Sequence, residues 1–151
     1  MSKEEKYGLL VKQVECLVEG CDDSVSLMAN VSAAIHETMG FFWTGFYVEK
    51  DNMLKLGPFQ GSVACYTIPH GKGVCGTAYE RKQTIVVPDV EQFPGHIACS
   101  SLSRSEIVVP VFDDMGNVKA VLDIDSKELS TFDATDAHYL EIIAKTISRH
   151  L

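Results

Sequence analysis

The chain has 151 residues, of which 46% are hydrophobic and 23% are charged, a composition typical of one globular domain over residues 1–151. Its formal net charge of -8 argues against the basic surface that nucleic acids and anionic membranes require, so we expect neither as a partner. No apolar stretch approaches the roughly 20 residues that span a bilayer, and the opening MSKEEKYGLL lacks the apolar core of a signal peptide. We therefore expect a cytoplasmic protein, in a compartment where thiols stay reduced.

Two amphipathic helices are predicted at the start of the chain. The first covers residues 2–19, where apolar side chains recur at helical spacing, and Gly20 is its expected stop. The second begins after the capping region 22–24 and ends at Gly40. The buried face of the second helix is expected to carry Leu27, Met28, Val31 and Ile35.

The periodicity then changes to that of strands. Residues 41–60 are rich in aromatic and β-branched side chains around a turn signal at Asp51-Asn52, which predicts a hairpin. A short strand is expected from Ala64 to Ile68. A helical turn is expected to begin near Gly73-Val74.

The second half of the chain predicts further strands and a closing helix. The run TIVVP is a strand that Pro88 ends, and residues 89–104 form a loop of a length that is usually functional or disordered. SEIVVPVFD and NVKAVLDIDS predict a hairpin around residues 114–117, and the last helix begins near Asp133. This order predicts an α+β fold with a mostly antiparallel central sheet of about six strands, flanked by N-terminal and C-terminal helices. One face of the last helix is expected to carry Leu140, Ile143, Ala144 and Ile147.

Three of the five cysteines lie in the loop-rich stretch from Gly57 to Arg104. Cys65, Cys75 and Cys99 form no CxxC pair, which disfavours zinc-ribbon and thioredoxin-type sites. Thiols in polar loops beside groups such as His96 suggest thiol chemistry, because a nearby positive charge or donor raises the thiolate fraction. Packing is the alternative, since buried cysteine often acts as a small hydrophobic residue. The two cysteines near the end of the first helix are interpreted as packing or surface thiols.

The sequence VLDIDS alternates two aspartates with apolar residues. In a strand, Asp123 and Asp125 therefore point to one face. If that face lines a pocket, the two carboxylates raise one another's pKa and can hold a proton near neutral pH. Glu106, at the start of the apolar run IVVP, is a third candidate acid. The alternative is a solvated strand face with ordinary surface carboxylates.

Six short motifs in register resemble the free methionine-(R)-sulfoxide reductase family, which has a GAF domain. They are GPFQGSVAC, GKGVCGTA, VVPDV, FPGHIAC, SEIVVP and VLDIDS, and the resemblance covers nearly the whole chain, most densely from Phe42 to Ser126. It implies a single GAF-like catalytic domain that reduces the R-sulfoxide of free methionine, with no cofactor or metal. It also implies thioredoxin as the usual reductant and a homodimer. Ser100, which follows Cys99, departs from the acidic residue expected there.

The resemblance also implies roles for the candidate residues. Cys99 is the implied nucleophile, Cys65 the main resolving thiol, and Cys75 an alternative resolving thiol or relay. Glu106 and Asp125 are implied in recognition of the sulfoxide oxygen. The expected substrate-binding residues are Asp123 in the same pocket, Trp43 and Tyr47 as an aromatic wall on one strand face, and Gly73, whose backbone N–H at a helix start could bind the substrate carboxylate.

Three alternative interpretations remain open. A GAF domain can act as a non-catalytic sensor of a small molecule, but plain binding would not require three matched cysteines. A zinc site could combine Cys65, Cys75, Cys99 and His96, although the short ligand pairs typical of structural zinc are missing. A Cys–His hydrolase could use Cys99 with His96, which leaves the other two cysteines unexplained.

Overall fold

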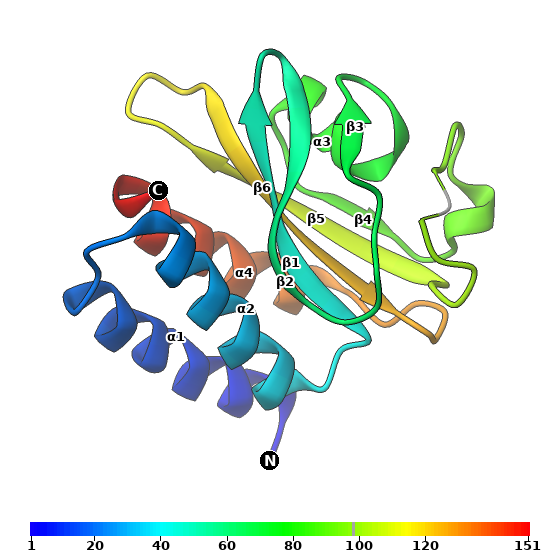
Figure 1. Cartoon of the computed structure of the whole chain (residues 1–151). Coiled ribbons are helices and arrows are strands. Elements are labelled where there is room, and N and C mark those ends of the chain that lie inside the picture. Colours follow the sequence, from blue (N-terminus) through cyan, green and yellow to red (C-terminus); the bar gives the residue numbers. More distant parts are fainter. Residues whose placement is uncertain (98) are drawn as a thin grey trace.

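The computed structural model describes residues 1–97 and 99–151, which form three layers (Figure 1). Two helices, α2 and α4, cover one face of a central sheet, with α1 packed against both of them, and the short helix α3 with its neighbouring loops covers the other face. Among the described residues, no helix combines the length and the apolar composition needed to cross a membrane. The helices are α1 (Lys3–Glu19), α2 (Ser24–Met39), α3 (Gly73–Arg81) and α4 (Ala134–Ile147), with 3-10 turns η1 (Val90–Gln92) and η2 (Ser148–His150).

The sheet of the described residues has six strands in the order β3-β2-β1-β6-β5-β4, and every pair is antiparallel. The hairpins β1–β2 and β5–β6 lie side by side because β1 pairs with β6. The predicted α+β class and antiparallel sheet are therefore confirmed. The strands are β1 (Trp43–Lys50), β2 (Met53–Gln60), β3 (Thr67–Pro69), β4 (Ile85–Val87), β5 (Ser105–Phe112) and β6 (Val118–Ser126).

Local capping explains the helix boundaries, which lie within two residues of the predicted ones. Ser2 and Glu5 form a capping box at the start of α1. Asp23 caps α2, and Gly40 ends it with a φ of 73°, a left-handed conformation that glycine adopts without steric strain. Asp133 caps α4 by accepting hydrogen bonds from two backbone N–H groups.

The short strand predicted from Ala64 to Ile68 is displaced in the structure. β3 begins at Thr67 and pairs with only the first three residues of β2. Residues 61–66 are irregular instead, and the Cys65 side chain in this segment is joined to a distant loop. This segment therefore forms a disulfide cross-link and not a strand.

Alternation along β1, β5 and β6 gives the sheet two chemically different faces. The helix-covered face packs against α2 and α4 in the larger apolar core, which α1 completes by packing on both helices. The pocket face is turned toward α3 and the loops, and it confirms that Asp123 and Asp125 share a face. The helix-covered face is formed by Phe46, Ile107, Val109, Leu122 and Ile124, and the pocket face by Trp43, Tyr47, Glu106, Asp123 and Asp125.

Candidate active site

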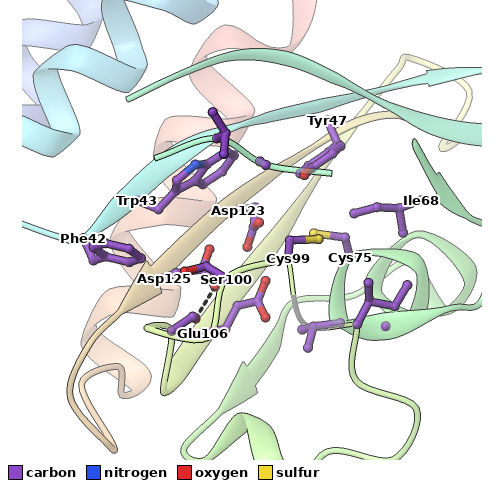
Figure 2. A pocket seen from close by; sticks show the side chains of 16 residues that line it. Phe42, Trp43, Tyr47, Ile68, Cys75, Cys99, Ser100, Glu106, Asp123 and Asp125 are labelled. Atoms are coloured by element: carbon purple, nitrogen blue, oxygen red, sulfur yellow. Dashed lines mark hydrogen bonds between the residues drawn. The ribbon is translucent and has the colours of Figure 1, made fainter. Parts of the chain in front are cut away.

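A pocket lies between the pocket face of the sheet, α3 and the loop that carries Cys99 (Figure 2). Its volume is about 50 Å³, room for a few water molecules. Cys99, Cys75, the three candidate acids and both aromatic side chains expected on β1 all line it. Residues from five separate stretches of sequence thus meet at one place, whereas Cys65 is not among the lining residues.

The three acids are brought together by the register of β5 and β6. Glu106 on β5 is directly opposite Asp125 on β6, and Asp123 follows two residues away on the same face. The exposed fractions of Glu106, Asp123 and Asp125 are only 6%, 6% and 9%. The alternative of a solvated strand face is therefore wrong.

The carboxyl groups share a strongly perturbed environment. Burial raises the pKa of Glu106 and of Asp125 well above the ordinary range, and the neighbouring Asp123 charge adds to both shifts. Burial also raises the pKa of Asp123, although hydrogen bonding from its neighbours acts in the opposite direction. Asp123 Oδ1 is buried and accepts no hydrogen bond within the described part of the chain. The cluster therefore retains protons near neutral pH and can act as an acid.

The thiols occupy distinct positions. Cys99 forms a disulfide with Cys65, which lies 34 residues earlier, with 5.5 Å between their Cα atoms. Cys99 lines the pocket, whereas Cys65 is not among its lining residues. Cys75 on α3 remains a buried thiol, and its burial together with the Asp123 charge raises its pKa well above the usual value. At neutral pH Cys75 is thus a protonated thiol and a poor nucleophile.

Of the two possibilities predicted beside Cys99, a positive charge or a hydrogen-bond donor, His96 does not supply the charge. Burial lowers the pKa of His96, against the opposing effect of the Asp123 charge, so this imidazole is mainly neutral near pH 7. Arg104 is exposed to solvent. His96 therefore offers a neutral ring rather than a positive charge beside the Cys99 loop.

Cys75, Glu106 and Asp123 each offer an atom that could coordinate a cation, and these atoms lie within 4.8 Å of one another. A thiol and two carboxylates could hold a divalent transition metal. The zinc site considered from the sequence does not fit this form of the protein. Two of its four ligands, Cys65 and Cys99, are bonded to each other and offer no thiolate.

The predicted aromatic wall is present on β1. The ring centroids of Trp43 and Tyr47 are 6.1 Å apart, and the indole also stacks on Phe59 at 5.1 Å. Trp43 Nε1 donates a hydrogen bond of 2.9 Å to the carbonyl oxygen of Ser62. The Tyr47 hydroxyl donates one of 3.0 Å to the carbonyl oxygen of Cys65. Both rings thus line the pocket and tether the segment that carries Cys65.

Sequence reasoning missed two glycines that make room for Trp43. A Cβ on Gly45 would lie 2.8 Å from the indole ring, and one on Gly61 would lie 2.5 Å from its Cδ1 atom. Gly61 also has a φ of 137°, which residues with side chains rarely adopt. The available signal was a glycine inside a strand pattern, which often marks a close approach of another group.

Gly73 is the first residue of α3, as predicted, and lines the pocket. Its φ is 64°, and a Cβ there would meet Ile97 at 3.1 Å. Its role toward a substrate carboxylate remains a prediction.

Ser103 is a further residue that sequence reasoning missed: its hydroxyl donates a 2.7 Å hydrogen bond to Asp125 Oδ1, drawn as the dashed line in Figure 2. That bond connects the loop of Cys99 to the acid cluster.

Comparisons with known proteins agree with this architecture. The profile of the GAF domain family matches residues 22–151. The chain is 52% identical over 147 residues to GAF domain-containing protein A of Dictyostelium discoideum, covering 97% of this chain and 92% of that protein. It is 43% identical over 157 residues to the free methionine-R-sulfoxide reductase of Saccharomyces cerevisiae, covering 99% and 87%.

The structure is also similar to a solved one. The X-ray structure of free methionine-R-sulfoxide reductase from Neisseria meningitidis, in complex with its substrate, superposes with a TM-score of 0.97 at 47% identity. The match covers 99% of this chain and 90% of that chain. Fold and sequence are thus similar over almost the whole of both proteins.

Proposed function

The chain belongs to the free methionine-R-sulfoxide reductase family of GAF-domain proteins, and we propose that it reduces free L-methionine-(R)-sulfoxide to methionine. One observation carries this proposal. Cys99, disulfide-bonded to Cys65, lines the same pocket as the buried acids Glu106, Asp123 and Asp125. Sulfoxide reduction needs a thiolate directed at sulfur and an acid directed at oxygen, because the oxygen leaves poorly unless it is protonated.

The chemistry proceeds in two steps. The Cys99 thiolate attacks the sulfoxide sulfur while a protonated carboxyl group, Glu106 or Asp125, donates a proton to the oxygen. This attack forms a transient bond between Cys99 Sγ and the substrate sulfur. The protonated oxygen then moves to Cys99 Sγ as the S–O bond of the substrate and the transient S–S bond break, so methionine leaves and Cys99 remains as a sulfenic acid. The Cys65 thiol then attacks this sulfenic sulfur and releases water. In sum, one sulfoxide and two thiols give methionine, one disulfide and one water.

Cys65 is the proposed resolving thiol, and Cys75 is assigned no bond-forming step. The bond between Cys65 and Cys99 joins the two sulfurs that the second step requires. Cys75 is buried, and its raised pKa leaves little thiolate at neutral pH. Its place beside Glu106 and Asp123 suits a relay of protons within the cluster better than attack on Cys99.

The zwitterionic substrate needs partners at each end. Trp43 and Tyr47 enclose its methyl-sulfur end, and the backbone N–H at Gly73 binds its carboxylate at the start of α3. Asp123, whose Oδ1 has no hydrogen-bond donor among the residues described, offers a partner for the ammonium group. We assign the preference for the R-sulfoxide on the likeness to the family.

We further propose that the whole chain, residues 1–151, works as one catalytic domain in the cytoplasm and as a homodimer. A reduced compartment supports turnover, because an oxidised Cys65–Cys99 pair must be reduced before each new cycle. A dithiol protein of the thioredoxin type is the proposed reductant.

The test supplies free R- and S-sulfoxides with dithiothreitol and follows methionine release. Cys99→Ser is expected to abolish turnover, whereas Cys16→Ser, at an exposed thiol on α1, should keep full activity. Cys65→Ser should release one methionine per protein and then recycle slowly with thioredoxin. Reduction of the S isomer, or multiple turnover by Cys99→Ser, would contradict the assignment. Binding of the sulfoxide without any methionine release would indicate a sensor instead.

A further inference from the structure

The segment that carries Cys65 is held by few contacts. Residues 61–66 lie between β2 and β3, form no helix or strand, and are mostly exposed. Within the described part of the chain, three hydrogen bonds join this segment to the rest of the protein. They run from Trp43 Nε1 to the Ser62 carbonyl, from the Tyr47 hydroxyl to the Cys65 carbonyl, and from the Leu56 N–H to the Tyr66 carbonyl. Of these, the bond from Tyr47 is the one that reaches Cys65 itself.

Tyr47 is a fixed donor for this bond. It lies on β1, which pairs with β2 on one side and with β6 on the other, in the middle of the sheet. The side chain is 2% exposed, and its hydroxyl donates to the Cys65 carbonyl oxygen at 3.0 Å. Burial, together with the Asp123 charge, raises the pKa of the Tyr47 phenol far above its ordinary range, so the hydroxyl keeps its proton. The sheet thus supplies a rigid donor to a segment without regular structure.

The ring and the hydroxyl of Tyr47 have different neighbours. The ring lines the pocket on the same strand as Trp43 (Figure 2), where the substrate is proposed to bind. The hydroxyl donates to the backbone of Cys65, a residue that does not line the pocket. Removal of the hydroxyl alone can therefore separate the hold on Cys65 from contact between the ring and the substrate.

We propose that Tyr47 is a positioning residue for the second step of the reaction: its hydroxyl holds the Cys65 thiol where it can attack the sulfenic acid on Cys99. The inference rests on the proposed function, which makes this attack part of every turnover. In the reduced protein the disulfide no longer confines segment 61–66, so the hydrogen bond from Tyr47 becomes the nearest restraint on Cys65. An attacking group that is already held near its target reacts faster, because less entropy is lost on the way to the transition state.

Tyr47 exchanges neither a proton nor an electron in this step. Cys65 Sγ bonds to Cys99 Sγ, the S–O bond of the sulfenic acid breaks, and the oxygen leaves as water with the proton of the Cys65 thiol. The hydrogen bond and the disulfide confine the same segment, so each makes the other more favourable. We therefore expect the Tyr47 hydroxyl both to speed disulfide formation and to raise the ratio of disulfide to dithiol at equilibrium.

The kinetic test uses Tyr47→Phe, which removes the hydroxyl and keeps the ring. Reduced protein is mixed with the free R-sulfoxide without any reductant. Dimedone traps the sulfenic acid at successive times, and peptide mass spectrometry measures the Cys65–Cys99 disulfide. We expect the variant to convert sulfenic acid to disulfide about three- to tenfold more slowly than the unmodified protein. This conversion follows the departure of methionine, so an effect of the substitution on substrate binding does not enter its rate constant.

Tyr79→Phe is the matched control. The Tyr79 hydroxyl, on α3, donates to Asn52 Oδ1 at 3.2 Å, and Tyr79 does not line the pocket. Its removal should leave the conversion as fast as in the unmodified protein. Equal slowing by both variants, or no slowing by Tyr47→Phe, would overturn the proposal. Methionine release slowed by the same factor as the conversion would also overturn it, because that result would indicate a general distortion of the pocket.

An equilibrium test measures the hold on Cys65 without the sulfoxide. The unmodified protein and Tyr47→Phe are equilibrated with mixtures of reduced and oxidised glutathione, and the fraction with the Cys65–Cys99 disulfide is measured. We expect the ratio of disulfide to dithiol to be about three- to tenfold lower in the variant at a given mixture. An equal ratio in the two proteins would overturn the proposal. Absence of methionine release by the unmodified protein would instead contradict the proposed function, and the glutathione equilibrium distinguishes the two failures.

Discussion

The two faces of β5 and β6 are made from alternating residues of the same strands, yet they have opposite physical properties. Ile107, Leu122 and Ile124 on the helix-covered face are fully buried in the apolar core. Their immediate neighbours Glu106 and Asp125 on the pocket face are nearly as buried but carry carboxyl groups. Burial stabilises the fold on one face and raises pKa values on the other.

On these two strands, therefore, one residue contributes to stability while its neighbour in the sequence contributes to function. Apolar burial on the helix-covered face contributes to the free energy of unfolding. Buried carboxyl groups on the pocket face oppose folding, because their ionised forms lose hydration. Buried carboxyl groups are kept where the reaction requires them, so activity is gained at the expense of stability. Substitutions on the two faces should therefore have effects of different kinds.

The largest expected effect comes from Asp125→Asn on the pocket face. The amide keeps the shape of the side chain but cannot supply or hold the exchangeable proton. We expect kcat/KM for methionine sulfoxide to fall about 10²- to 10⁴-fold, the usual contribution of a general acid, while the midpoint of thermal unfolding is maintained or raised. Steady-state methionine release and calorimetry measure the two quantities.

The matched variant on the helix-covered face is Ile124→Ala, one residue away. It removes fully buried apolar atoms, so the free energy of unfolding should fall by about 2–5 kcal/mol. Activity per folded molecule should stay close to that of the unmodified protein. The comparison of the faces would fail if Ile124→Ala lost activity as strongly as Asp125→Asn at a temperature where both are folded.

A smaller effect is expected from Asp123→Asn. Burial raises the pKa of Asp123, so between its ordinary and its raised pKa the unfolded chain releases the proton before the folded chain does. The contribution of this residue to stability therefore falls as pH rises through that window. Asparagine removes the titration and should stabilise the protein at pH 8 by about 1 kcal/mol.

The pH dependence identifies the cause. At pH 4, close to the ordinary aspartic acid pKa of 3.8, Asp123 is protonated in the folded state and about half protonated in the unfolded state, so the difference in unfolding free energy between Asp123→Asn and the unmodified protein should shrink. Urea unfolding at pH 4 and pH 8 measures it. A stabilisation that is equal at both pH values would show that the charge of Asp123 is not responsible.

The same contrast between faces explains what the sequence could predict. Amphipathic periodicity, capping residues and turn signals located the helices and most strands, because each of these signals is local. The alternation of VLDIDS correctly placed Asp123 and Asp125 on one face. The displaced β3 shows the limit: an apolar run beside a cysteine does not reveal a cross-link to a loop 34 residues away.

The site was predictable from motifs but its supporting contacts were not. The hydrogen bond from Ser103 to Asp125 joins residues 22 positions apart, and serines are too common in loops to indicate one partner. The closeness of Gly61 to Trp43 likewise depends on the β1–β2 register, in which Thr44 is opposite Gln60 and which shifts between Gly45 and Tyr47. Such contacts arise from tertiary packing, which no local pattern in the sequence specifies.

The smallest effect is expected from Ser103→Ala, which removes a single hydrogen bond to Asp125 on the pocket face. The Ser103 hydroxyl stabilises ionised Asp125 and so counteracts the effect of burial, which raises the pKa of that carboxyl group well above its usual value. Without the hydroxyl, the pKa of Asp125 should rise further. If protonated Asp125 is the acid, activity is lost as pH rises through that pKa, and the variant should retain activity to higher pH.

The variant should also lose a few-fold in kcat near neutral pH, because the loop of Cys99 loses its tether to the acid. Ser103→Thr, which keeps the hydroxyl, should restore both kcat and the pH profile. Ser101→Ala, at an exposed position of the same loop, should change neither. An alkaline limb at the same pH in Ser103→Ala and the unmodified protein would mean that Asp125 does not titrate in catalysis, leaving Glu106 as the proton donor of the pocket face.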